Sequence, residues 1–143
     1  MWGEAIDILL VEDNPGDVFL IRHAFQEGSL KKRLHVVEDG EEALEFLFRC
    51  GRHGDAPRPD LVLLDLNLPK IDGRAVLEEI KGEPDLRHIP VLILSTSNSD
   101  RDVEHSYEHH ANCYLTKPSD LFEYLDLIRE VEEYWLNMVC LPA

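Results

Sequence analysis

Five short apolar runs alternate along the chain with longer stretches whose apolar positions recur at helical spacing. The first run, IDILLV from Ile6, is rich in branched side chains and ends at the polar segment EDNPGD, which is typical of a strand buried on both faces. The other runs are RLHVV (33–37), LVLLDL (61–66), VLILS (91–95) and CYLT (113–116). Five strands alternating with helices predict an α/β fold, a doubly wound parallel sheet with helices on both faces.

The intervening stretches carry helix start and stop signals. Gly28 stands where the first helix should end, and Asp39 and Glu42 have the spacing of a capping box. The helices are expected to begin near Asp17, Asp39, Gly73, Asp100 and Ser119. Their expected buried positions are Val18, Ile21, Ala24 and Phe25, then Ala43, Leu44, Leu47 and Phe48, then Val76, Leu77 and Ile80, and last Phe122, Leu125, Ile128 and Trp135.

Length and charge narrow the possible functions. A chain of 143 residues suits one domain with its own core. Its net charge of −15 would repel a polyanion, so we expect no nucleic-acid binding. No run approaches the roughly 20 apolar residues of a membrane span, and the start of the chain lacks a signal peptide's basic segment. Three scattered cysteines suggest neither a disulfide framework nor a zinc site. We therefore expect a cytoplasmic protein.

Reactive side chains stand where the predicted strands end. Glu12 and Asp13 follow the first strand, Asp65 lies near the end of the third, Ser95 ends the fourth, and Lys117 follows the fifth. In a doubly wound sheet the functional crevice lies at the carboxyl ends of the strands, so these side chains should converge there. Clustered carboxylates are best tolerated around a hard divalent cation such as Mg²⁺.

A carboxylate flanked by a metal ion and a lysine is equipped for phosphoryl transfer. Asp65 would attack the phosphorus of an incoming phosphoryl group and form an aspartyl phosphate. Because this reaction depends mainly on positioning and charge neutralisation, Mg²⁺ and Lys117 would supply what it needs. The Ser95 hydroxyl could donate a hydrogen bond to a phosphoryl oxygen.

These residues resemble the receiver domains of response regulators, which have a flavodoxin-like fold. The resemblance lies in the acidic pair of LLVEDNPGD, the motif LLDLNLPKIDG, the hydroxyl residue of ILSTS, the aromatic Tyr114 and the dipeptide of Lys117 and Pro118. It implies the strand order 2-1-3-4-5 and a receiver domain over residues 5–130. It also implies a protein that takes a phosphoryl group stoichiometrically from a sensor histidine kinase and is no enzyme acting on outside substrates.

The resemblance further implies how the site residues divide their work. Asp13 and Asp65 would bind Mg²⁺ through their side chains and Asn67 through its backbone carbonyl, with Glu12 holding a water of the metal shell. Mn²⁺ or Ca²⁺ could replace Mg²⁺. The peptide bond between Lys117 and Pro118 would be cis and aim the lysine inward.

A switch is implied as well. Phosphorylation would draw Ser95 toward the acyl phosphate and let Tyr114 rotate into the vacated space. That would reshape the face made by the fourth helix, the fifth strand and the fifth helix. At His110 most receivers have a glycine in a left-handed turn, and histidine tolerates that conformation.

Three segments resemble the small regulators that partner phytochrome-type kinases of cyanobacteria: PDLRHIPV, HHANCYLTKP and EEYWLNMVCLP. The last belongs to residues 131–143, which we expect to form a helical extension without an attached output domain. This extension could fold back on the core, but its surplus apolar groups favour a homodimer or partner contact. The contact residues expected there are Tyr134, Trp135, Met138 and Val139.

Other functions remain to be weighed. An aspartyl-nucleophile phosphatase would need a second acid where Asn67 stands, and a flavin carrier would need phosphate donors in place of the acidic EDNPGD. A pseudo-receiver that never carries phosphate typically loses residues that this chain retains. His105 and His109 have metal-ligand spacing, but no third ligand is evident, so we expect them on a solvated helix face.

Overall fold

The computed structural model describes residues 5–142, in which five parallel strands form one sheet in the order β2-β1-β3-β4-β5. The strands are β1 (Ile6–Val11), β2 (Lys32–Val37), β3 (Leu61–Leu64), β4 (Val91–Ser95) and β5 (Cys113–Thr116). Every residue of β3 and β4 is buried, as expected for central strands covered on both faces. The predicted fold and strand order are confirmed.

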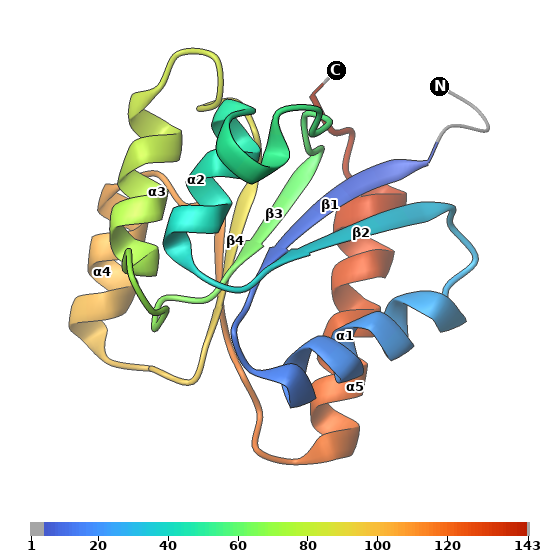
Figure 1. Ribbon diagram of the computed structural model, residues 1–143. Helices are drawn as coiled ribbons and strands as arrows, with labels where there is room; N and C mark the ends of the chain where they lie inside the picture. Colours follow the sequence, from blue (N-terminus) through green and yellow to red (C-terminus); the bar gives the residue numbers. More distant parts are fainter. Residues whose placement is uncertain (1–4, 143) are drawn as a thin grey trace.

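Helices cover both faces of the sheet (Figure 1). The helices α1 (Pro15–Glu27) and α5 (Leu121–Val131) lie on one face, and α2 (Gly40–Phe48), α3 (Gly73–Gly82) and α4 (Asp100–Glu108) lie on the other. Accordingly, the core is divided in two by the sheet: one cluster gathers side chains of α2 and α3, and the other gathers side chains of α1 and α5. No helix within the described residues is long and apolar enough to cross a membrane.

Side-chain caps fix where the helices begin. The side chain of Asn14 accepts hydrogen bonds from the backbone of Gly16 and Asp17, and Asp39 accepts one from the backbone of Glu42 at 2.7 Å. The capping box is only half formed, because the Glu42 carboxylate accepts from the backbone N–H of Glu38 and not from that of Asp39. α1 ends at Glu27, so the predicted stop at Gly28 is confirmed.

Two of the predicted buried positions are wrong. Phe48 is 43% exposed, and Phe46 occupies the core in its place. Phe122 is 72% exposed, whereas Tyr124 is buried with Ile128 against the sheet. In both helices several neighbouring residues are apolar, so hydrophobicity alone does not show which of them faces the sheet.

The chain continues without a break from α5 into a π-helical segment, η2 (Glu132–Met138). Glu132 is buried and forms an ion pair with Lys32 of β2 at 2.7 Å. Trp135 and Leu136 pack against the core cluster shared by α1 and α5, while Tyr134 and Met138 are 54% and 69% exposed. The expected extension 131–143 thus packs partly on its own domain, and Ala143 lies outside the described residues.

Candidate functional site

The carboxyl ends of four strands, β1, β3, β4 and β5, bring the predicted reactive side chains to one edge of the sheet. The sheet bonding continues past the strands: the backbone N–H of Asp65 donates to Val11, and that of Lys117 donates to Ser95 at 2.7 Å. Glu12 is held likewise by a backbone bond to Val37 of β2. Parallel pairing therefore fixes the backbone of each site residue before any side-chain contact is considered.

Lys117 is the cation of this site. Its Nζ donates hydrogen bonds to Glu12 Oε1 at 2.5 Å, Asp17 Oδ2 at 2.8 Å and Asp65 Oδ2 at 3.0 Å. The Lys117 side chain is 5% exposed, so water screens these contacts little. The expected cis bond before Pro118 is absent, since the described residues contain no cis peptide. Lys117 nevertheless points inward, because its backbone is fixed by the bond to Ser95.

The acids outnumber the cation. Carboxylate oxygens of Glu12, Asp13 and Asp65 lie within 4.8 Å of one another. Burial raises the pKa of Glu12 to about 7, and the neighbouring charge of Asp65 adds to the rise, against the opposing effect of the Lys117 bond. For Lys117 burial lowers the pKa, but the bonds to Asp17 and Glu12 outweigh it, so the pKa is raised and the ammonium stays charged.

This set of oxygens fits a hard divalent cation. Glu12 is 1% exposed, and a buried carboxylate with a raised pKa is one that a second cation would stabilise. Asp13 is exposed and so leaves the cluster open to ions from solvent. The geometry therefore supports a metal site of oxygen ligands at this edge, as predicted.

The loop after β3 presents Asp65. Its Oδ1 accepts a hydrogen bond from the backbone N–H of Asn67 at 3.3 Å, and Asn67 itself is exposed. Gly73 begins α3 directly against this loop: its N–H donates to Leu66 O at 2.9 Å, and a Cβ on it would lie 2.1 Å from the carbonyl oxygen of Asp65. Only glycine fits there without moving Asp65.

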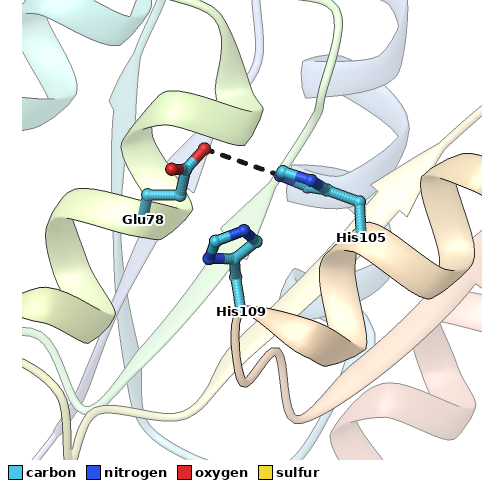
Figure 2. Close-up of side chains that lie close together, drawn as sticks. All are labelled: Glu78, His105 and His109. Atoms are coloured by element: carbon cyan, nitrogen blue, oxygen red, sulfur yellow. Dashed lines mark ion pairs between the residues drawn. The ribbon is translucent and has the colours of Figure 1, made fainter.

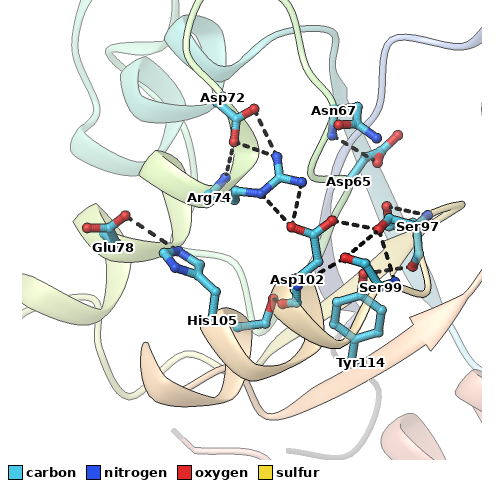
Figure 3. Close-up of polar contacts among 12 residues, drawn as sticks. Asp65, Asn67, Asp72, Arg74, Glu78, Ser97, Ser99, Asp102, His105 and Tyr114 are labelled. Carbon is cyan, nitrogen blue, oxygen red and sulfur yellow. Dashed lines mark hydrogen bonds and ion pairs between the residues drawn. The ribbon is translucent and has the colours of Figure 1, made fainter.

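Ser95 and Tyr114 are linked through Ser97. The Ser95 Oγ, which is fully buried, accepts from the Ser97 N–H at 3.2 Å, and the Tyr114 hydroxyl donates to the Ser97 carbonyl at 2.8 Å. The Ser97 hydroxyl in turn donates to Asp102 of α4, which also accepts from Arg74 of α3 (Figure 3). A movement of the Ser95 side chain could therefore displace the loop at Ser97, which is bonded to both α4 and Tyr114. His110 has φ 68°, the left-handed conformation that we predicted.

Two features were not foreseen from the sequence. Asp17, in the first turn of α1, is a direct partner of Lys117, and its only signal was a third acid in EDNPGD. Glu78 of α3 also lies beside His105 and His109, a neighbour that the sequence did not make evident (Figure 2). The spacing of residues along one helix does not show which side chains of a neighbouring helix lie beside them.

Known proteins resemble the chain over most of its length. The profile of the response regulator receiver domain matches residues 8–129. Response regulator Rcp1 of Synechocystis sp. is 47% identical over 136 residues, which are 95% of this chain and 92% of Rcp1.

Solved structures agree with this sequence likeness. The crystal structure of the Mn²⁺-bound form of Rcp1 has a TM-score of 0.94 and 46% identity and covers 96% of this chain and 99% of its own. The phosphorylated cyanobacterial phytochrome response regulator RcpA has a TM-score of 0.95 and 46% identity and covers 98% of this chain and 100% of its own. The similarity thus extends beyond the sheet to nearly every described element.

Proposed function

The chain belongs to the response regulator receiver family, and we propose that it signals by accepting a phosphoryl group on Asp65 from a sensor histidine kinase. The observation that carries this proposal is the position of Lys117, whose ammonium donates hydrogen bonds to Asp65 and Glu12, which follow two different strands. No other acid at the strand ends combines burial, contact with this lysine and a place directly after the central strand β3.

The chemistry follows from these contacts. A carboxylate oxygen of Asp65 would attack the phosphorus, and the bond from phosphorus to the donor's nitrogen or oxygen would break, with its electron pair leaving on the donor. Lys117 would stay charged and shift its bond from the carboxylate to an oxygen of the phosphoryl group. The product, an acyl phosphate on Asp65, would be held by the same ammonium.

Mg²⁺ is the metal that we propose for the carboxylate cluster. Asp13 and Asp65 would bind it directly, Asn67 through its backbone carbonyl, and Glu12 through a water. When bound, Mg²⁺ would neutralise the acids and the incoming phosphoryl oxygens. Support comes from the convergence of three carboxylates in this chain and from the Mn²⁺-bound form of Rcp1.

The switch that we propose uses Ser95 and Tyr114. A phosphoryl oxygen would draw the Ser95 hydroxyl and loosen its bond with the Ser97 N–H, which is 3.2 Å long. The loop would then move the Ser97 carbonyl, to which the Tyr114 hydroxyl is bonded, and Tyr114 would turn inward. The face of α4, β5 and α5 would be reshaped as a result.

A phytochrome-type histidine kinase is the partner that the resemblance favours. RcpA is a phytochrome response regulator, and it is as similar to this chain as Rcp1 is. The proposal predicts faster phosphotransfer from a phytochrome-type kinase than from unrelated histidine kinases of equal activity. Equal rates from all donors would rule out a phytochrome-type kinase as the preferred partner. They would not contradict the proposal that Asp65 accepts a phosphoryl group.

We further propose that η2 and the residues after it contact a second copy or the partner. Tyr134 and Met138 are exposed, and Trp135 and Val139 are partly exposed beside them. Sedimentation at tens of micromolar should show a dimer that Tyr134→Ser with Met138→Ser weakens. A wild-type monomer in both phosphorylation states would rule out the dimer.

The function is tested by the mass of the intact protein. Acetyl phosphate with Mg²⁺ should add one phosphoryl group, about 80 Da, to the wild type and none to Asp65→Asn. Asp7→Asn, which changes an acid at the other end of β1, is the matched control and should still gain the mass. No gain in the wild type would favour a pseudo-receiver, and steady release of phosphate from generic phosphoesters would favour a phosphatase.

A further inference from the structure

Glu78, His105 and His109 form a second group of metal-binding side chains on the face opposite α1 and α5. Glu78 belongs to α3, His105 lies in the last turn of α4, and His109 is the residue that caps α4. Figure 2 shows the three side chains turned toward one another across the space between these helices. The imidazole centroids of His105 and His109 are 4.4 Å apart, and His105 Nε2 lies 3.6 Å from Glu78 Oε2.

The polar atoms of this group are not satisfied by one another. His105 Nε2 is buried and has no hydrogen-bond partner, since 3.6 Å to Glu78 is too long for one. A buried polar atom without a partner destabilises the fold. The atom nevertheless points at a carboxylate and shares its surroundings with a second imidazole, which is an arrangement that a shared cation would complete.

The spacing of the ligand atoms is close to that of a tetrahedral metal. One ligand atom from each of the three residues lies within 4.8 Å of the other two. Metal bonds of about 2.0 to 2.2 Å in a tetrahedron place ligand atoms roughly 3.3 to 3.5 Å apart. Small side-chain rotations would close the difference. Glu78 is exposed, so a fourth position would face solvent and could hold water.

We propose that Glu78, His105 and His109 form a binding site for a divalent transition metal of the zinc class. Two imidazoles and a carboxylate suit Zn²⁺, Co²⁺, Ni²⁺ and Cu²⁺, whereas Mg²⁺ prefers a cage of oxygens only. The chain would then hold two cations of different chemistry, a hard one at Asp65 and a softer one between α3 and α4.

A bound metal would hold α4 against α3. Arg74 of α3 already bonds Asp102 of α4 at 2.9 and 2.8 Å, one turn before His105 (Figure 3). The metal would add a second link at the other end of α4. Its binding needs no phosphorylation, so the site stands or fails independently of the function proposed for Asp65.

The experiment is a titration of the full, tag-free chain with Co²⁺, followed by displacement with Zn²⁺, in millimolar Mg²⁺ that occupies the carboxylate site. Visible absorption of Co²⁺ should saturate at one metal per chain with the intensity of a tetrahedral site that contains nitrogen ligands. His105→Gln and His109→Gln should each weaken binding at least about tenfold. Glu78→Gln should weaken it as well while leaving both histidines in place.

Two variants serve as matched controls. His23→Gln removes a histidine that lies 3.7 Å from Glu27 on a helix, with the same two side-chain types but no second imidazole. Asp65→Asn alters the other metal site. Both should bind Co²⁺ as the wild type does. Absence of saturable binding, binding that survives both histidine changes, or binding lost in Asp65→Asn would each overturn the proposal.

Discussion

The two ends of β1 each carry buried acid, but the surroundings differ. At the amino end the Asp7 carboxylate accepts two bonds from Arg33, at 2.8 and 3.1 Å, and contacts His35 Nε2 at 2.9 Å. At the carboxyl end Glu12 shares the ammonium of Lys117 with Asp17 and Asp65. Asp7 thus receives two hydrogen bonds from one arginine, whereas Glu12 shares one ammonium with two other acids.

The pKa values record this difference. The hydrogen bonds from Arg33 hold the pKa of Asp7 below its ordinary value of 3.8, despite burial. Burial and the charge of Asp65 raise the pKa of Glu12 to about 7. A carboxylate whose charge is balanced by neighbouring side chains, such as Asp7, stabilises the fold. Buried carboxylates that outnumber the nearby cations, as around Glu12, favour the binding of a cation from solvent. The two ends of β1 thus carry one carboxylate with a lowered pKa and one with a raised pKa.

Removing the cation at each end should have very different effects on phosphorylation, and this is the largest difference that we predict. Lys117→Gln should slow phosphate uptake from acetyl phosphate by about 100- to 1000-fold, because a buried group that stabilises the developing charge is lost. Arg33→Gln should change the rate less than about twofold. The rates are measured by intact mass over time, and equal losses in both variants would break the comparison.

Mg²⁺ should stabilise the protein only through the carboxylate cluster at the carboxyl end of β1. At about 100 times its dissociation constant, Mg²⁺ should raise the free energy of unfolding by about 2.7 kcal/mol. Asp13→Asn should lose most of this gain, and Asp7→Asn should keep it. Urea unfolding with Mg²⁺ and with chelator measures both, and an Asp7→Asn protein that no longer responds to Mg²⁺ would contradict the assignment.

Asp7→Asn should destabilise the fold without affecting the site. Hydrogen bonds to a charged group contribute about 1.5 to 3 kcal/mol, but Arg33 is 60% exposed, so we expect a loss of about 1 to 2 kcal/mol. Urea unfolding at neutral pH gives the loss. A stability equal to that of the wild type would mean that solvent screens the pair completely.

The smallest effect should be in the pH dependence. Since the pKa of Asp7 is lower in the folded protein than in the unfolded chain, its contribution is fully present above about pH 4 and disappears as the pH falls through the folded value. The difference in unfolding free energy between wild type and Asp7→Asn should therefore shrink below about pH 4. A difference that stays constant down to about pH 2 would show that Asp7 contributes by shape and not by charge.

The sequence predicted the central strands well because β3 and β4 are buried on both faces, and it also located the partly buried edge strand β5. The runs at 91–95 and 113–116 agree with β4 and β5 residue by residue, since an apolar run that ends in polar residues has little freedom in its bounds. The convergence of Glu12, Asp13, Asp65 and Lys117 followed from the rule that parallel strands share a carboxyl edge.

Lateral contacts between helices were harder to predict. Phe48 and Phe122 were assigned to the core, but hydrophobicity gave no means to tell them from Phe46 and Tyr124, which lie two positions away. Asp17 and Glu78 were missed as partners because each reaches its contact from another element. Such contacts depend on how helices are rotated and spaced, and one sequence carries no direct record of that.

The most direct test locates the phosphoryl group in the chain. Borohydride converts an aspartyl phosphate into homoserine, and peptide mass spectrometry after reaction with acetyl phosphate and Mg²⁺ shows which position has changed. We predict homoserine at position 65 and at no other position, because Asp65 is the buried acid that follows β3 and contacts Lys117. Modification at position 7 or 13, or none at 65, would contradict the account.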